Sequence, residues 1–260
     1  MYWITKKYKY VVFNLKKKIN LDSKKLKFNN LENLFNYFGT DKGSKILDPY
    51  NSSPKKSFIK GHNFGKFYEK NLKKIKNKEI NVLEIGVWRG ASTASFFYYL
   101  PNANFVAIDR NFKFTFFSRR INFFFCDTTS KNNLKKLTEF LVKKNITSFD
   151  VIIDDSSHIL SDILKNFIFF FKFLKSKGIY IIEDYRHPNY FSYLNDKKNH
   201  FLVDKVLNFI KKKQIFKSTI LKKRQIKYLN NNIKKIITYK GSCITKDRGN
   251  ISDIAFVYKK

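Results

Sequence analysis

The sequence predicts an α/β fold with a seven-stranded, mostly parallel sheet, a terminal antiparallel hairpin and a helical N-terminal extension. From residue 81 onward, short apolar runs that suit buried strands alternate with stretches of helical spacing. The first run, 81–86, ends in a glycine turn and leads directly into a helix-like stretch, which is the start of a βα unit. The last two strand-like runs have no helix between them, so we expect them to pair antiparallel at the sheet edge.

The chain length allows one domain, or one domain with an extension. The 260 residues include 29 Phe, and an apolar content of 43% is enough for a sizeable core. We expect residues 1–75 to form a basic N-terminal extension that carries the segment GTDKG, and residues 76–260 to form the main domain. Residues 1 to about 30 are weakly patterned, which leaves a helical arm and partial disorder both open.

The elements follow in order from the spacing of apolar residues. A short helix LENLFNYF begins at Leu31 and is closed by Gly39, and the spacing of Phe64, Phe67 and Tyr68 predicts a second helix. Further helices are expected at about 91–99, 131–144, 160–176 and 200–212, with Gly178 capping the third of these. Strands are expected at about 81–86, in the runs that end at Asp109, Asp127, Asp155 and Asp184, and at about 233–246 and 253–258.

The net charge of +33 would ordinarily indicate a nucleic acid or an anionic membrane as partner. Lysines, however, are spread from Lys6 to Lys260, which indicates a compositional bias rather than a patch. We therefore expect no specific nucleic-acid partner and only weak contact with anionic membrane surfaces. Cys126 and Cys243 lie outside any C-x-x-C motif, and neither a signal peptide nor a transmembrane segment is visible, so we expect a cytoplasmic protein.

The turn from Gly86 to Gly90 is a candidate ligand site. Glycine lets the backbone turn sharply and lets a ligand come close, and the helix that follows directs its free N–H groups at that ligand. The spacing is G-x-x-x-G rather than the G-x-G-x-x-G of most dinucleotide sites. A tight turn without a ligand is the alternative interpretation of this motif alone.

Acidic residues end most of the predicted parallel strands, and ligands of such sheets bind at those ends. A carboxylate at the end of the second strand can accept hydrogen bonds from both hydroxyls of a ribose, which assigns Asp109. Asp127, after the third strand, is placed to accept from an adenine amino group. For each residue the alternative is a surface acid that caps a turn or a helix.

The segments IIDDSSH and IIEDY predict a cation site. Neighbouring strands lie about 4.8 Å apart, so their ends should bring Asp154, Asp155, Glu183 and Asp184 together. Carboxylates gathered in one cleft repel one another unless a cation is present, and oxygen ligands suit Mg²⁺ or a similar divalent ion. His158 follows closely and could act as a general base near pH 7. The alternative is a set of helix-capping acids and a surface histidine.

The chain resembles class I S-adenosylmethionine-dependent methyltransferases, which have a Rossmann-like fold. Within them it is similar to the metal-dependent sugar O-methyltransferases of the macrocin and mycinamicin type and to the cephalosporin-hydroxylase-like group. Three features carry the resemblance over about residues 35–260: GTDKG followed by H-x-F-x-x-x-Y, LEIGVWRGAS, and the pair DDSSH and IIED. Ser156 stands where some members carry glycine, and the N-terminal arm departs further, which leaves substrate choice and oligomer contacts open.

The resemblance implies a methyl transfer from S-adenosylmethionine to a sugar hydroxyl of a glycan, glycolipid or glycosylated metabolite, by a homo-oligomer. It implies that Asp155, Glu183 and Asp184 hold Mg²⁺ and that His158 removes the hydroxyl proton. It also implies that Glu84, Gly86 and Gly90 cradle the methionine part of the cofactor. The full set expected on the cofactor side is Thr40, Lys42, Glu84, Gly86, Gly90, Ser92, Asp109, Asp127 and Asp154, and the set expected on the substrate side is His62, Tyr68 and His187.

Three other functions remain open on the sequence. A nucleic-acid methyltransferase is supported by charge alone, and it predicts salt-dependent RNA binding. A binding protein on a degenerate methyltransferase fold would lose no function in an Asp155→Ala variant. An oxygenase would need a redox metal, and the sequence shows no triad of two histidines and one carboxylate that would hold one.

Overall fold

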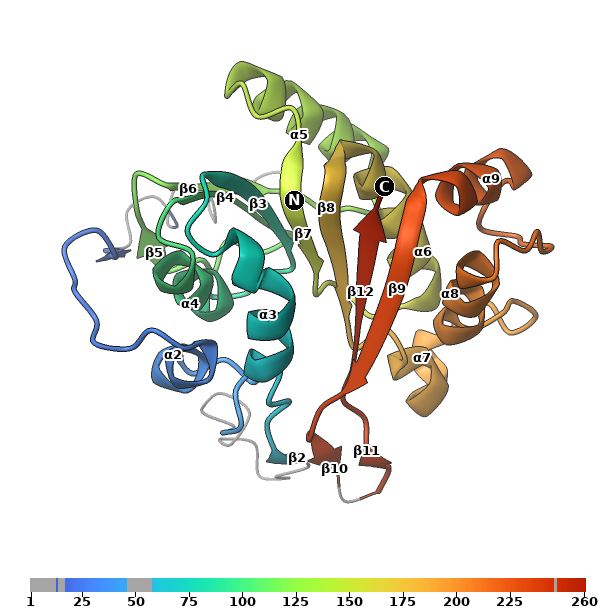
Figure 1. Ribbon diagram of the computed structural model, residues 1–260, viewed down its shortest axis with the longest axis horizontal. Coiled ribbons are helices and arrows are strands. Elements are labelled where there is room, and N and C mark those ends of the chain that lie inside the picture. The colour runs from blue at the N-terminus through green and yellow to red at the C-terminus, as the bar shows by residue number, and fades with distance from the viewer. Residues whose placement is uncertain (1–12, 14–16, 46–57, 246) are drawn as a thin grey trace, which may run out of the picture.

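A twisted sheet of seven strands runs through the centre of the molecule (Figure 1). The computed structural model describes residues 13, 17–45, 58–245 and 247–260. The strand order is β6-β4-β3-β7-β8-β12-β9, in which the first five strands are mutually parallel and β12 is antiparallel to both of its neighbours. The strands are β3 (Ile80–Ile85), β4 (Ala103–Asp109), β6 (Ile121–Phe125), β7 (Phe149–Asp154), β8 (Leu174–Glu183), β9 (Ile233–Lys240) and β12 (Asp253–Lys259).

The order of the strands reverses next to β3, and this reversal locates the ligand crevice. The chain passes from β3 to β4 and β6 on one side, and then returns to place β7 and β8 on the other side. In open α/β sheets, ligands bind outside the carboxyl ends of the strands at such a switch point. The strand order also confirms the expected seven-stranded, mostly parallel sheet with a closing antiparallel pair.

Helices cover both faces of the sheet (Figure 1). One face carries α2, α3 and α4, whereas α5, α6, α8 and α9 lie against the other. Successive residues of β3 point to opposite faces of the sheet. Val82 packs in the core under α2, α3 and α4, and Leu83 packs in the core on the other face, as expected for a strand buried on both sides. The helices are α2 (Leu31–Phe38), α3 (Gly65–Leu72), α4 (Ala91–Tyr99), α5 (Lys131–Lys143), α6 (Leu160–Phe170), α7 (His187–Tyr190), α8 (Val203–Lys211) and α9 (Lys223–Asn232).

Aromatic packing joins the N-terminal helices to the sheet domain. Phe35 of α2 and Tyr68 of α3 both pack edge-on against Phe96 of α4, with ring centroids 5.4 Å and 4.9 Å away. Asn30 caps α2, and Gly39 ends it in a left-handed conformation, as the sequence predicts. These contacts bring the GTDKG segment, which follows α2, to the ends of the sheet strands.

Short elements complete the fold. β1 (Ile19–Asn20) pairs with β5 (Phe116–Phe117), and β2 (Phe58–Lys60) pairs with β10 (Ile244–Thr245), which in turn pairs with β11 (Gly249–Asn250). The 3₁₀ turns are η1 (Lys73–Ile75), η2 (Phe171–Phe173) and η3 (Ser192–Leu194). The predicted alternatives of a helical arm or partial disorder for residues 1 to about 30 concern a segment of which residues 1–12 and 14–16 lie outside the described part of the chain. Within those residues, no helix has the length and apolar character needed to span a bilayer.

The third predicted helix of the main domain is shorter than expected. We predicted 160–176 with Gly178 as its cap, but α6 ends at Phe170, and Gly178 lies inside β8. Phe171 and Leu174 are buried apolar residues that suit a helix face and a strand equally, so their spacing does not mark the boundary. The prediction of Gly178 as a helix cap is therefore wrong.

Candidate active site

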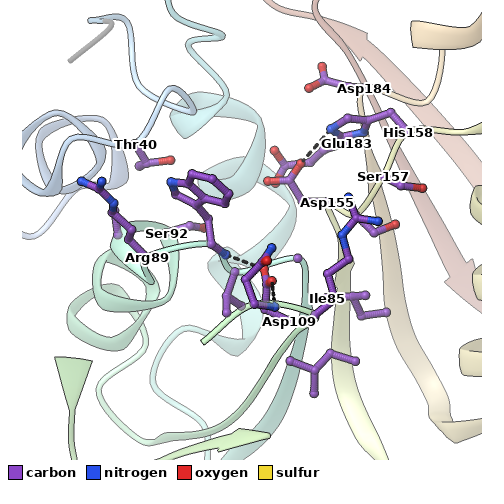
Figure 2. A pocket seen from close by; sticks show the side chains of 18 of the residues that line it. Thr40, Ile85, Arg89, Ser92, Asp109, Asp155, Ser157, His158, Glu183 and Asp184 are labelled. Atoms are coloured by element: carbon purple, nitrogen blue, oxygen red, sulfur yellow. Dashed lines mark hydrogen bonds and ion pairs between the residues drawn. The ribbon is translucent and has the colours of Figure 1, made fainter. Parts of the chain in front are cut away.

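A cavity of about 660 Å³ opens at the carboxyl ends of β3, β4, β7 and β8. One end lies beside Asp109, and the other lies among Asp155, His158 and Glu183 (Figure 2). Most of the residues predicted from the sequence line it: Thr40, Lys42, His62, Gly86, Ser92, Asp109, Asp127, Asp155, His158, Glu183, Asp184 and His187. Four predicted residues lie outside the lining: Tyr68, Glu84, Gly90 and Asp154.

The glycine turn joins the two halves of the cavity. Gly86 has a φ of 86°, and a Cβ atom there would lie 2.1 Å from the backbone oxygen of Asp155, so only glycine fits. Gly90, with a φ of 91°, forms the N-cap of α4. Glu84 is buried below this turn, where its carboxylate accepts hydrogen bonds from the hydroxyls of Ser92 and Thr93. Glu84 therefore fixes the start of α4 to the end of β3 and contacts the cavity only indirectly.

Asp109 is held by the backbone at one end of the cavity. Its Oδ2 accepts a hydrogen bond of 2.8 Å from the backbone N–H of Trp88, and its Oδ1 accepts one of 2.7 Å from that of Asn111 (Figure 2). Burial raises the pKa of Asp109, although these two backbone bonds oppose the shift. Asp127 lies in the same part of the cavity and accepts a 3.0 Å bond from the backbone N–H of Thr129.

The opposite end of the cavity contains three carboxylates and an ammonium group. Lys42 Nζ forms ion pairs with Asp155 and with Glu183, the latter at 2.7 Å from Oε2. Tyr68, which is fully buried, donates its hydroxyl hydrogen to Glu183, so it reaches the site by supporting a carboxylate. Burial raises the pKa of Glu183, with Lys42 opposing the shift. Burial also favours protonated Asp155, but the ammonium group of Lys42 outweighs it and lowers the pKa of that carboxyl.

Three histidines surround the third carboxylate, Asp184. Its Oδ1 lies 3.3 Å from His62 Nδ1 and 3.5 Å from His187 Nε2, and His158 Nε2 lies 3.6 Å from Asp155 Oδ1. Burial lowers the pKa of His62 and of His158, and it lowers that of His187 to about 2, so the imidazoles are neutral at pH 7. Burial and the neighbouring carboxylates raise the pKa of Asp184 well above its usual value.

The residues at this end fit a divalent cation. An ammonium group already lies between Asp155 and Glu183, which shows that the carboxylates favour positive charge. Asp184 Oδ1 is buried and has no hydrogen-bond partner among the described residues, so an acceptor is available for a further cation. Carboxylate oxygens are the ligands that Mg²⁺ prefers, and the set is compatible with it.

Asp154 stands apart from the other three acids. Successive residues of a strand point to opposite faces, so the side chain of Asp154 points away from that of Asp155. Its Oδ2 accepts a 2.9 Å hydrogen bond from the hydroxyl of Tyr180, on the face that α6 covers. Burial raises its pKa to about 6. The expected group of four carboxylates therefore contains three members on the cavity side.

Several cavity residues were not singled out from the sequence. Trp88 and Arg89 line the cavity from inside the glycine turn, and Asp162 of α6 accepts a 2.7 Å bond from the hydroxyl of Ser157. The position of Trp88 and Arg89 within VWRG was an available signal. Asp162 offered little, since an acid in the first turn of a helix is common for other reasons.

Comparison with known proteins finds similar sequences among O-methyltransferases. No known family model matches the chain. The mycinamicin VI 2''-O-methyltransferase of Micromonospora griseorubida is 27% identical over 139 residues, which are 51% of this chain and 33% of that protein. The L-olivosyl-oleandolide 3-O-methyltransferase of Streptomyces antibioticus is 30% identical over 134 residues, 47% of this chain and 32% of that protein. The matched segments thus span about a third of the length of these relatives.

A solved structure shows the same fold. The MycE methyltransferase of the mycinamycin biosynthetic pathway, in complex with Mg, SAH and mycinamycin VI, matches with a TM-score of 0.63 and 21% identity. The match covers 90% of this chain and 55% of that chain. The Rossmann-like class I methyltransferase fold and the resemblance to sugar O-methyltransferases are therefore confirmed.

Proposed function

We propose that the chain is an S-adenosylmethionine-dependent, divalent-cation-assisted O-methyltransferase that acts on a sugar hydroxyl of a glycan, glycolipid or glycosylated metabolite. One observation carries the proposal. A single cavity has a backbone-held carboxylate, Asp109, at one end and three carboxylates with His158 at the other. The similarity to relatives named as sugar O-methyltransferases supports the same function.

The first half of the cavity suits the nucleoside part of the cofactor. Asp109 accepts hydrogen bonds from the ribose hydroxyls, and the N–H groups of Trp88 and Asn111 keep its carboxylate in place. Asp127 accepts from the adenine amino group. Gly86 lets the methionine part pass close to the backbone, toward Asp155.

The second half suits the acceptor. Asp155, Glu183 and Asp184 would hold the divalent ion, which would orient the acceptor hydroxyl and lower its pKa when bound. The neutral imidazole of His158 takes the hydroxyl proton, and the Asp155 carboxylate 3.6 Å away stabilises the resulting imidazolium. The acceptor oxygen forms a bond to the methyl carbon as the bond from that carbon to the sulfonium breaks, and the sulfur leaves uncharged. The sulfonium is already reactive, so positioning in the cavity is the main contribution of the protein.

The test is a calorimetric titration of the full chain with S-adenosylmethionine, with and without Mg²⁺, at moderate salt. Saturable binding is expected, and transfer of a labelled methyl group to nucleotide sugars and glycosides is then measured. An absence of cofactor binding in both conditions would remove the proposal and favour a binding protein on the same fold. The cytoplasmic location and the homo-oligomeric state stay predictions.

A further inference from the structure

Histidine is concentrated at one end of the cavity. The chain has four histidines, and three of them, His62, His158 and His187, line this cavity. His158, Asp184 and His187 each offer one ligand atom, and these atoms all lie within 4.8 Å of one another. This set differs from the carboxylates that pair with Lys42, because it contributes two imidazole nitrogens and only one oxygen. It is a triad of two histidines and one carboxylate, which the sequence alone did not reveal.

Two atoms of the set, which lie 3.5 Å from each other, are buried and make no hydrogen bond within the described residues. Asp184 Oδ1 and His187 Nε2 have no hydrogen-bond partner in the part of the chain that the structure describes. The Asp184 side chain is only 8% exposed and that of His187 is 12% exposed, so water satisfies them poorly. Buried polar atoms are nearly always paired in proteins, and a site for an ion is one of the few reasons for an exception.

The backbone directs these side chains toward one point. His158 and Asp184 both have left-handed φ angles, of 57° and 51°, and each follows the end of a neighbouring strand. His187 is held in the next turn, where its N–H donates a 2.8 Å bond to the carbonyl of Asp184. Left-handed backbone costs free energy in residues other than glycine, and such residues cluster at functional sites.

We propose that His158, Asp184 and His187 form a second cation position in the cavity, which shares Asp184 with the carboxylates proposed for Mg²⁺ and takes borderline divalent ions such as Zn²⁺ or Co²⁺ in preference to Mg²⁺. Two imidazole nitrogens and one carboxylate with an open position are a ligand set that Zn²⁺ accepts, whereas Mg²⁺ favours oxygen. One consequence rests on the proposed function. An ion there occupies a nitrogen of His158, so Zn²⁺ inhibits methyl transfer by removing the base.

The test uses the full chain after treatment with a chelator. Co²⁺ is added in the presence of excess Mg²⁺, and the visible absorbance of the ligated ion is recorded. Zn²⁺ is then titrated by calorimetry under the same conditions. We expect one bound Co²⁺ that Mg²⁺ fails to displace and that Zn²⁺ displaces. A signal that disappears in excess Mg²⁺ would overturn the proposal.

Variants locate the ion. His187→Asn should weaken Zn²⁺ binding by at least about tenfold, because it removes one of three ligands. His158→Asn should do the same, and asparagine tolerates the left-handed backbone, which keeps this variant folded. His200→Asn is the matched control, since His200 bonds to the hydroxyl of Ser218 outside the cavity. Unchanged Zn²⁺ affinity in both cavity variants would contradict the assignment.

The proposed function and the proposed second cation position can be disproved independently of each other. Zn²⁺ binding without S-adenosylmethionine binding would leave the cation position and remove the methyltransferase function. Binding of S-adenosylmethionine without a histidine-dependent Zn²⁺ site would remove the cation position alone.

Discussion

The two ends of the cavity fix their carboxylates with different partners. Asp109 accepts hydrogen bonds from two backbone N–H groups, which are part of the turns that follow β3 and β4. Asp155 and Glu183 instead share the side-chain ammonium of Lys42. A backbone donor remains in place whatever binds, whereas an ammonium group on a flexible stem can be displaced by another cation. Under the proposed function, the nucleoside end of the cavity, beside Asp109, is therefore preformed, and the cation at the acceptor end, beside Asp155 and Glu183, is exchangeable.

The largest effect is expected at the acceptor end. Asp155→Asn should lower methyl transfer by about 10³-fold or more, because it removes a charged ligand of the cation and the partner of His158. Affinity for S-adenosylmethionine should change little, since Asp109 is untouched. Rates are measured with a labelled methyl group and affinity by calorimetry. Asp150→Asn, which removes the ion pair with Lys175 at the other end of β7, is the control. Full activity in the Asp155 variant would show that the two ends do not differ in role.

The Lys42→Met variant tests whether a divalent ion can take the place of the Lys42 ammonium group beside Asp155 and Glu183. Removing one partner of a buried ion pair costs about 3–5 kcal/mol, so the free energy of unfolding in chelator should fall by about that amount. Mg²⁺ should restore most of it, because the divalent ion takes the place of the ammonium group. Urea unfolding is measured with and without Mg²⁺. If Mg²⁺ stabilises the variant no more than the unaltered chain, Lys42 and the cation do not share a position.

Asp154, which lies at neither end of the cavity, predicts a pH dependence of the free energy of unfolding. Burial raises the folded-state pKa of Asp154 from 3.8 to about 6, so the folded state retains this proton up to a higher pH than the unfolded state does. Its stabilising effect is present below about pH 4 and is lost as the pH rises to about 6, a change of about 3 kcal/mol. Asp154→Asn should remove this part of the pH dependence. Urea unfolding between these pH values checks it, and an unchanged profile would count against it.

The smallest effect is expected at the nucleoside end. Asp109→Ala should raise the dissociation constant of S-adenosylmethionine by about 10–100-fold, because hydrogen bonds to a charged group contribute about 1.5–3 kcal/mol. Binding of the divalent cation should be unaffected, since the carboxylates near Lys42 keep their partners. Both affinities are measured by calorimetry. A matching loss of cation binding would show that the two ends are coupled.

The sequence reveals these two ends unequally. The environment of Asp109 depends on residues close in the chain, which occupy turns after adjacent strands, so strand ends and glycines were enough to predict its place. The ion pairs of Lys42 join residues 113 and 141 positions away, and no local pattern indicates them. The histidine grouping was missed for the same reason, because His187 reaches His158 through the pairing of β7 with β8.

Secondary structure shows a similar limit. The strands of the sheet were found because buried apolar runs end in acids, whereas α9 was missed because its sequence, KRQIKYLNNN, buries only Ile226, Leu229 and Asn230. The position of Asp154 was misjudged because two consecutive acids at a strand end look alike in sequence. Their side chains leave the strand on opposite faces, and only one of them enters the cavity.

The contact between Gly86 and the Asp155 carbonyl has a consequence for any attempt to redesign this protein. Because two backbone segments touch there with no room for a side chain, the spacing between the two ends of the cavity is set by the main chain. Under the proposed function, exchanging side chains around the acceptor end can change which molecule enters, but it leaves this spacing as it is. The choice of substrate and the spacing of the two ends are thus separate design variables, and Gly86→Ala would disturb the second by forcing the two backbone segments apart.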